Sequence, residues 1–166
     1  MINNKKILIT GAGGYLGGNL CYLFSKLNYD LVCLDINKSR LNFLKKKLHK
    51  FKNKKYYFSV DITDQKRIFD VYNHLKKKKC NINIIINNAA NNPSVKKTNE
   101  AKLMNIKDWK NDLDVGLMGS YIITKTFVDN LKKNKGGSII NIGSDLSILS
   151  PNHEIYKSGN WNTGFL

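Results

Sequence analysis

The stretch that decides the fold covers residues 5–18 and reads Lys-Lys-Ile-Leu-Ile-Thr-Gly-Ala-Gly-Gly-Tyr-Leu-Gly-Gly. The apolar run at 7–9 lies between lysines and glycines, which predicts a short buried strand of a parallel sheet. Behind the glycines, a helix is predicted because apolar residues recur at helical spacing, namely Leu16, Leu20, Leu23, Phe24 and Leu27. A glycine turn lets a pyrophosphate approach the backbone, and the helix N-terminus offers free N–H groups and a positive dipole end. The stretch therefore predicts a phosphate-binding turn, with an ordinary glycine-rich turn as the alternative.

The glycine spacing is Thr10-Gly11-x-x-Gly14-x-x-Gly17, which differs from G-x-G-x-x-G because position 16 is Leu. This pattern resembles the nucleotide loop of the short-chain dehydrogenases/reductases. The resemblance implies a Rossmann fold, an NAD(P) cofactor, and hydride transfer between nicotinamide and an alcohol or carbonyl group. It also implies that the phosphate turn is shaped and lined by Gly11, Gly14, Tyr15, Leu16 and Gly17.

The rest of the chain repeats the alternation of strand and helix. Apolar runs at 31–34, 56–60, 82–86 and 138–142 are separated by segments with helical periodicity. This alternation predicts an α/β protein with a doubly wound parallel sheet in three layers, and a ligand crevice at the carboxyl edge of the strands. We expect a single NAD(P)-binding domain over residues 1–166 that stops after the fifth strand, with 150–166 as a loop or insertion.

An acidic residue ends the predicted second strand. Asp35 lies 18 positions after Gly17, where the dinucleotide fold places a carboxylate that accepts hydrogen bonds from the adenosine ribose. Asp35 would repel a 2′-phosphate, so NAD is favoured over NADP, although Lys38 and Arg40 lie close enough in sequence to face a phosphate. The alternative for Asp35 is a turn residue before a helix cap.

The resemblance implies roles for residues at the ends of the later strands. Asp61 and Ile62 match the pair that touches the adenine, and Asp64 is expected to cap the helix that follows. The segment Asn87-Asn88-Ala89-Ala90 is similar to the family's Asn-Asn-Ala-Gly, which places Asn88, Ala89 and Ala90 beside the nicotinamide end of the cofactor. Ser144 matches the catalytic serine that hydrogen-bonds the substrate oxygen; a serine that merely ends a strand is the alternative.

The chain departs from the family pattern at two catalytic positions. Gly116 stands where the family has the Asn of its catalytic tetrad; an exposed main-chain carbonyl or a water is one substitute for its side chain. Tyr156 follows Ser144 by 12 residues, but the residue four positions later is Asn160 rather than Lys. Either Tyr156 acts without its lysine in a weak or inactive protein, or the Tyr-x-x-x-Lys helix lies beyond Leu166. We favour the second explanation, so the chain as given is expected to bind the cofactor without turnover.

The substrate class rests on a further resemblance. The run from Gly143 to Tyr156 is similar to reductases associated with surface-glycan and flagellin-sugar biosynthesis, which implies a sugar or nucleotide-sugar substrate. A non-catalytic dinucleotide-binding module is one alternative function. A nucleotide-sugar epimerase or dehydratase is another, because it shares the glycine spacing, although the Asn-Asn-Ala-Ala segment favours a simple reductase.

Composition argues against nucleic acid as a partner. The 166 residues carry a net charge of +16, but the basic residues are 26 Lys and only 2 Arg. A nucleic-acid binder would use more Arg, which pairs bidentately with phosphate and guanine. The Lys runs at 45–47 and 76–79 are expected late in helices, where cations suit the helix dipole.

The sequence shows no signal for export, a membrane span or a metal. No apolar run approaches the length of a membrane span, and no signal-type apolar segment precedes the glycine turn. Three cysteines and three scattered histidines show no metal-ligand spacing, and Cys21 and Cys33 are expected to be buried. We expect a cytoplasmic protein with a small-molecule substrate and no membrane partner. The resemblance adds that the helix over 109–131 packs against another subunit, which predicts a homo-oligomer at full length.

Overall fold

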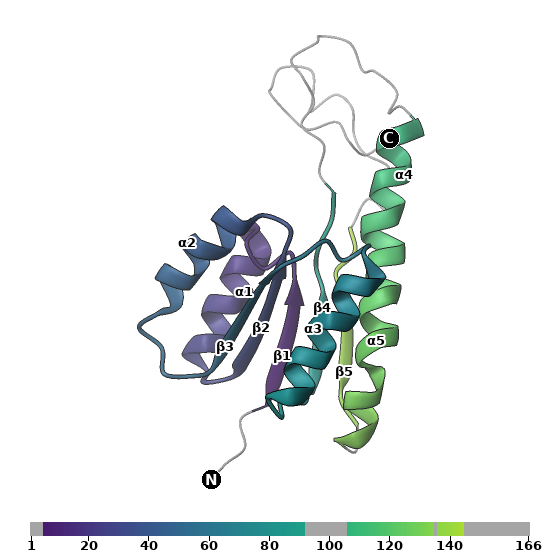
Figure 1. Cartoon of the computed structure of the whole chain (residues 1–166). Coiled ribbons are helices and arrows are strands. Elements are labelled where there is room, and N and C mark those ends of the chain that lie inside the picture. Colours follow the sequence, from purple (N-terminus) through teal and green to yellow (C-terminus); the bar gives the residue numbers. More distant parts are fainter. Residues whose placement is uncertain (1–4, 92–105, 135, 145–166) are drawn as a thin grey trace, which may run out of the picture.

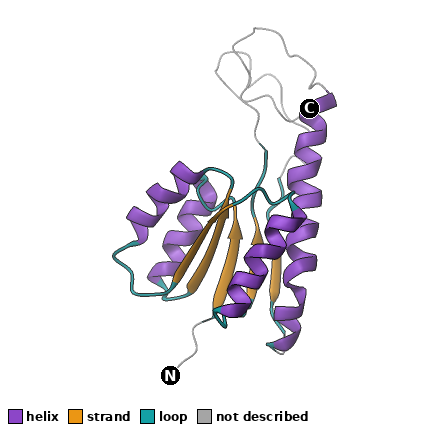
Figure 2. Ribbon diagram, in the orientation of Figure 1, coloured by secondary structure: helices purple, strands orange, loops and turns teal. Residues whose placement is uncertain are grey.

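The computed structural model describes residues 5–91, 106–134 and 136–144 and confirms the predicted fold class (Figures 1 and 2). A five-stranded parallel sheet has the order β3-β2-β1-β4-β5. The strands are β1 (Lys6–Thr10), β2 (Asp30–Asp35), β3 (Lys55–Ser59), β4 (Ile84–Asn87) and β5 (Ser138–Asn141). The helices are α1 (Tyr15–Lys26), α2 (Lys38–Leu48), α3 (Gln65–Lys77), α4 (Ile106–Leu113), the π-helical segment η1 (Asp114–Gly119) and α5 (Ser120–Lys133). The loop or insertion predicted at 150–166 lies outside the described residues.

Helices cover both faces of the sheet. Successive side chains of a strand point to opposite faces, and apolar side chains are buried on each face. Ile7 and Ile9 of β1 belong to an apolar cluster with residues of α1 and α2. Leu8 points to the other face, where it joins a cluster with residues of α3 and α5. Figure 1 shows α1 and α2 together on one side of the sheet and α3 and α5 on the other. The central strand β1 is therefore buried on both faces, which explains its uninterrupted apolar run.

The predicted helix forms as α1, but its apolar residues are only partly buried, with Leu20 and Phe24 half-buried against the apolar cluster. Leu16 and Leu23 are 46% and 49% exposed, whereas the buried residues of the helix are Gly17, Cys21 and Ser25. Small residues on this face let the helix backbone lie close to the end of β1. The sulfur atoms of Cys21 and Cys33 lie 3.7 Å apart on this side of the sheet, and both thiols are buried as predicted.

The helical pattern after residue 106 forms three segments rather than one continuous α-helix. A π-helical segment over Asp114–Gly119 separates α4 from α5. Gly116 lies in this segment, and a Cβ added there would meet nothing within 4 Å. Glycine contributes little to helix stability, and π-helical turns occur mostly as short interruptions of this kind.

One apolar surface of α4, η1 and α5 is exposed, as is β5. Trp109, Leu117 and Tyr121 are each more than half exposed, and Ile139 and Ile140 are about 40% exposed. The helical part of this surface belongs to the helix over 109–131, which the resemblance implies packs against another subunit. Within the described ranges no helix combines the length and apolar character needed to cross a membrane.

Candidate functional site

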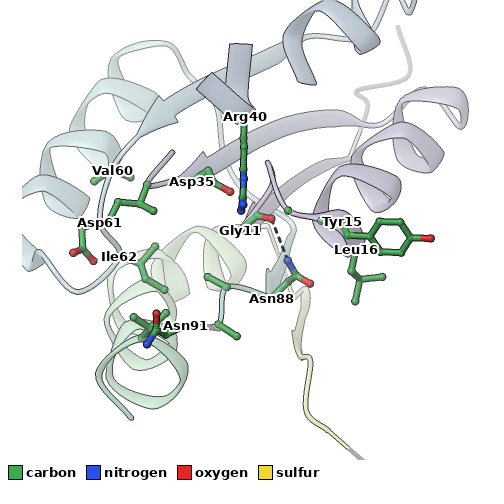
Figure 3. A pocket seen from close by; sticks show the side chains of 16 residues that line it. Gly11, Tyr15, Leu16, Asp35, Arg40, Val60, Asp61, Ile62, Asn88 and Asn91 are labelled. Carbon is green, nitrogen blue, oxygen red and sulfur yellow. Dashed lines mark hydrogen bonds between the residues drawn. The ribbon is translucent and has the colours of Figure 1, made fainter. Parts of the chain in front are cut away.

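A pocket of about 480 Å³ lies at the carboxyl edge of the sheet (Figure 3). It is formed by the glycine turn after β1 and by the chain that follows β2, β3 and β4. Every residue that the sequence predicts to hold the cofactor lines this pocket: Gly11, Gly14, Tyr15, Leu16, Gly17, Asp35, Asp61, Ile62, Asn88, Ala89 and Ala90. The remaining lining residues were not predicted as site residues: Ile36, Arg40, Val60, Asn91 and Val115.

The glycine turn leaves the N-terminus of α1 open. Gly11 has a φ of +63°, a conformation that favours glycine, and its carbonyl accepts the N–H of Gly14 at 3.0 Å. Gly14 is the N-cap of α1 and provides no side-chain hydrogen bond. The first N–H groups of a helix have no partner within the helix, and Gly14 has no side chain to cap those of α1, which lie at the pocket. This arrangement fits a pyrophosphate, which would accept hydrogen bonds from these groups.

Asp35 connects the end of β2 to the glycine turn. Its Oδ2 accepts the backbone N–H of Gly13 at 2.8 Å, and its Oδ1 accepts that of Asn37, also at 2.8 Å. The side chain is buried, with 7% of the residue exposed. Asn37 caps α2 by accepting the backbone N–H of Arg40. Asp35 therefore also fits the alternative interpretation, in which it is a turn residue before a helix cap. Each carboxylate oxygen can still accept another hydrogen bond, which leaves capacity for a ribose hydroxyl.

Thr10 joins the ends of β1 and β4, a role that the sequence analysis missed. Its Oγ1 accepts the backbone N–H groups of Asn88 and Ala89, both at 3.0 Å. In return, the amide nitrogen of the Asn88 side chain donates to the Thr10 carbonyl at 2.9 Å. Thr10 itself is buried, with 1% of the residue exposed, and these bonds fix the strand ends on which the pocket is built. The available signal was a hydroxyl residue at the end of an otherwise apolar strand.

The far wall of the pocket depends on a glycine of η1. A Cβ added to Gly119 would lie 2.5 Å from Cδ1 of Ile62, so the absence of a side chain there lets Ile62 take its place beside Val115. On the same wall, the Asn91 side chain donates to Asp112 Oδ1 at 2.8 Å. This bond ties the chain after β4 to α4.

A polar cluster lies where β4, β5 and α5 meet. The Asn87 side-chain amide donates to Asn141 Oδ1 at 2.8 Å and to Thr124 Oγ1 at 3.2 Å. Its own Oδ1 is buried and has no hydrogen-bond partner among the described residues. These bonds fix β5, which leads directly to Ser144.

The predicted catalytic positions are not brought together in the described part of the chain. Ser144 follows β5 at the same edge of the sheet but does not line the pocket, and Tyr156 lies outside the described residues. The carbonyl of Gly116, one predicted substitute for the missing Asn side chain, accepts the Ser120 hydroxyl at 2.7 Å. Among the described residues, no group of three or more His, Cys, Asp or Glu is placed to hold a metal.

Residues 5–158 match the family model described as short chain dehydrogenase. The chain is 29% identical over 149 residues to the 3-oxoacyl-(acyl-carrier-protein) reductase FabG of Thermotoga maritima, with 89% of this chain and 58% of that protein covered. It is 32% identical over 148 residues to the uncharacterized oxidoreductase YDL114W of Saccharomyces cerevisiae, with 89% and 45% covered. The chain thus spans about half the length of the curated relatives it matches.

Solved structures show the same fold. The structure of an NAD+-bound xylitol dehydrogenase is similar with a TM-score of 0.80 at 17% identity, covering 99% of this chain and 61% of that one. A serine dehydrogenase complexed with NADP+ gives a TM-score of 0.75 at 23% identity, with 92% and 60% covered. Because the family model matches nearly the whole chain and the architecture agrees with it, the chain belongs to the short-chain dehydrogenase family.

Proposed function

We propose that this chain is the NAD-binding part of an oxidoreductase that transfers hydride between nicotinamide and an alcohol or carbonyl group. The observation that carries the proposal is the open N-terminus of α1 beside the carboxylate of Asp35, at one edge of a parallel sheet. A pyrophosphate binds to free N–H groups at a helix N-terminus. The adenosine ribose next to it donates hydrogen bonds to a carboxylate at the end of the second strand. The carboxylate at this position is also the reason to propose NAD in preference to NADP.

The pocket suggests where each part of the cofactor would lie. The pyrophosphate would bind over the turn shaped by Gly11, Gly14 and Gly17, with Tyr15 and Leu16 beside it. The adenosine ribose would reach Asp35, and the adenine would lie toward Asp61 and Ile62. The chain from Asn88 to Ala90 would flank the nicotinamide side, with Ser144 beyond it to orient the substrate oxygen. Bound nicotinamide would supply or accept the hydride; the residues named here would position it.

We propose that the proton-transfer groups of this chain are incomplete and that it binds the cofactor without turnover. A tyrosine that exchanges a proton with the substrate oxygen has an ordinary pKa of about 10. A lysine on the same helix face would lower it toward neutral pH, but Asn160 stands four residues after Tyr156. The substrate would be a sugar or nucleotide-sugar. This proposal rests on the resemblance of the run from Gly143 to Tyr156 to reductases associated with surface-glycan and flagellin-sugar biosynthesis.

A titration monitored by NADH fluorescence, combined with a dehydrogenase assay, tests this function. We expect saturable NADH binding, displacement by ADP-ribose, and no oxidation or reduction of sugar substrates by this chain. A folded protein that binds neither NADH nor NADPH would contradict the proposal. Turnover by the chain as given would contradict the proposed lack of a proton donor while leaving the binding site intact.

We also propose that the whole protein is a homo-oligomer and has no nucleic-acid partner. The exposed apolar side chains of α4, η1 and α5 support an interface, because a large exposed apolar surface is costly for a monomer. Light scattering after gel filtration would measure the oligomeric state, and a monomer at micromolar concentration would contradict this proposal. Retention on DNA at physiological salt would contradict the absence of a nucleic-acid partner.

A further inference from the structure

Two buried cysteines face each other between α1 and β2, and the proposed function uses neither of them. The Sγ atoms of Cys21 and Cys33 lie 3.7 Å apart, and neither residue is exposed to solvent. Both belong to the apolar cluster that α1 and α2 form with one face of the sheet. Because a buried cysteine packs like any small apolar residue, packing alone does not account for two sulfur atoms in contact.

The separation is short enough for a disulfide to form after a small movement. The S–S bond of a disulfide is about 2.05 Å long, so the two sulfur atoms would have to approach by a further ~1.7 Å. Cys21 belongs to α1 and Cys33 to β2, so the bond would join the helix directly to the sheet. Cys80, the third cysteine, is buried in the apolar cluster on the opposite face of the sheet.

The movement that closes this bond acts on the glycine turn. Cys21 lies one helical turn after Gly17 on the buried face of α1. A Cβ added to Gly17 would collide with the Gly11 carbonyl, so α1 already rests on the turn at this point and cannot come closer. Drawing Cys21 toward β2 therefore tilts α1, because a close-packed interior transmits such a shift. A tilt displaces the N–H groups at the start of the helix.

The other thiol is close to the cofactor site along β2. Cys33 and Asp35 are two residues apart in the strand, so their side chains point to the same face of the sheet. The Asp35 carboxylate accepts the backbone N–H of Gly13 and so holds the glycine turn to β2. A shift of Cys33 thus also acts on the carboxylate that would bind the adenosine ribose.

We propose that Cys21 and Cys33 form a redox modification site, at which hydrogen peroxide converts the two thiols to a disulfide that weakens dinucleotide binding. One thiolate attacks a peroxide oxygen, the O–O bond breaks, and the leaving hydroxide takes up the proton that the thiol lost. The other thiol attacks the resulting sulfenic sulfur, the S–S bond forms, and a second water leaves. Two thiols are oxidised and one peroxide is reduced to two waters. The effect on binding rests on the proposed function, whereas formation of the bond does not.

Burial makes the reaction depend on a local opening of α1. The hydrogen bond with Cys21 and burial raise the pKa of the Cys33 thiol well above its usual value, and the thiolate is the form that reacts. Oxidation therefore takes place when α1 separates transiently from the sheet. Bound NADH would hold the start of α1 in place. It should slow the oxidation, because two events that disfavour each other do so reciprocally.

Treatment of the reduced chain with hydrogen peroxide, followed by intact mass and peptide mapping, tests formation of the bond. Cys80→Ala is the main sample, because the thiols that it retains are those of Cys21 and Cys33. Cys21→Ala and Cys33→Ala are matched controls that keep one thiol of the pair. We expect Cys80→Ala to lose the mass of two hydrogen atoms through a bond within one chain, at least about fivefold more slowly with saturating NADH.

An NADH titration of the reduced and oxidised forms then measures the effect on the cofactor site. We expect the disulfide to raise the dissociation constant for NADH by at least about tenfold, and dithiothreitol to restore the original value. Cys21→Ala cannot form the bond, so peroxide should leave its NADH affinity unchanged. The unmodified chain should respond as Cys80→Ala does, which shows that the substitution itself is not the cause.

Three results would overturn the proposal. The first is a chain in which Cys21 and Cys33 stay reduced, or react singly or with other chains instead of with each other. The second is a disulfide that leaves the NADH affinity within about threefold of the reduced value. The third is an equal loss of affinity in peroxide-treated Cys21→Ala, which would show damage elsewhere. If the reduced, folded chain does not bind NADH, the proposed function fails and the effect on binding falls with it, while the mass measurement still decides whether the bond forms.

Discussion

Two neighbouring glycines of α1 should respond in opposite ways to the same substitution. In Gly17→Ala the added methyl group would collide with the carbonyl oxygen of Gly11 and lie 2.9 Å from the amide nitrogen of Asn88. Neither atom can move freely, because the Gly11 carbonyl accepts the N–H of Gly14 and the Asn88 amide donates to Thr10. In Gly18→Ala the nearest atoms, of Ala12 and Leu44, are 3.6 and 3.9 Å away, which is ordinary contact.

The magnitudes follow from these distances. Alanine in a helix interior is favoured over glycine by up to about 1 kcal/mol, and Gly18→Ala should gain most of this. Forcing a methyl group into a filled space costs about 1–3 kcal/mol or more. Because the space at Gly17 is filled by backbone, we expect about 3 kcal/mol there, which leaves a net loss of about 2 kcal/mol after the helix gain is subtracted. The two variants should then differ by about 3 kcal/mol, and at about 2–4 °C per kcal/mol for a chain of this size their melting temperatures should differ by roughly 6–12 °C.

Thermal and urea unfolding of the two variants, followed by an NADH titration, measures both consequences. Gly17→Ala should also lose NADH affinity by at least about tenfold, because the displaced turn no longer presents the N–H groups of α1 to the pyrophosphate. Gly18→Ala should bind NADH as the unmodified chain does. Equal stability and equal NADH affinity in the two variants would refute the reasoning about the close approach of α1 to β1.

Three further predictions concern the strand ends, the far wall of the pocket and the response to pH. Thr10→Val should lower the free energy of unfolding by about 1–3 kcal/mol in urea titrations, because it leaves two half-buried N–H groups without their acceptor. Thr10→Ser keeps the acceptor oxygen, and an equal loss there would contradict this cause. Gly119→Ala should push Ile62 toward the pocket and weaken NADH binding. Gly116→Ala should leave NADH binding unchanged, because its added methyl group meets nothing within 4 Å. Calorimetry with NADH compares the two variants, and equal affinities would show that Ile62 does not form a wall of the NADH site. Burial raises the pKa of the Cys80 thiol from its usual 9.0 to about 11. The folded state therefore keeps the neutral thiol, and the free energy of unfolding should fall as pH rises from about 9 to 11, by up to about 1.4 kcal/mol per pH unit. Urea titrations at pH 8 and 10 should show a smaller fall in Cys80→Ala; an unchanged fall would exclude this thiol as a cause.

The sheet could be predicted from the sequence because its strands are marked locally. A strand buried on both faces needs an uninterrupted apolar run, and β1 and β2 each have one between polar boundaries. The pocket was equally predictable at the strand ends, since parallel strands place Gly11, Asp35, Asp61 and Asn88 at one edge once the alternation is recognised. The cap formed by Asp64 was predicted for the same local reason, and its side chain accepts the N–H of Arg67.

Features that depend on tertiary distances were not predictable in this way. The leucines of α1 have helical spacing, but the face that packs on the sheet is set by Gly17, Cys21 and Ser25, whose small size allows close approach. The π-helical segment depends on a change of hydrogen-bond register that no local residue pattern specifies. Arg40 was visible only as a nearby cation, because its place in the pocket depends on how α2 packs against the glycine turn.

We propose that backbone N–H groups at the start of α1 bind the pyrophosphate of a dinucleotide. An amide-resolved NMR titration of the ¹⁵N-labelled chain with NADH would show this binding residue by residue. We predict that the amide resonances of Gly14, Tyr15, Leu16 and Gly17 shift with saturation, while those of Lys76 and Lys77, at the opposite edge of the sheet, stay in place. If the first-turn resonances of α1 remain unchanged in a folded chain at saturating NADH, these N–H groups do not bind the pyrophosphate.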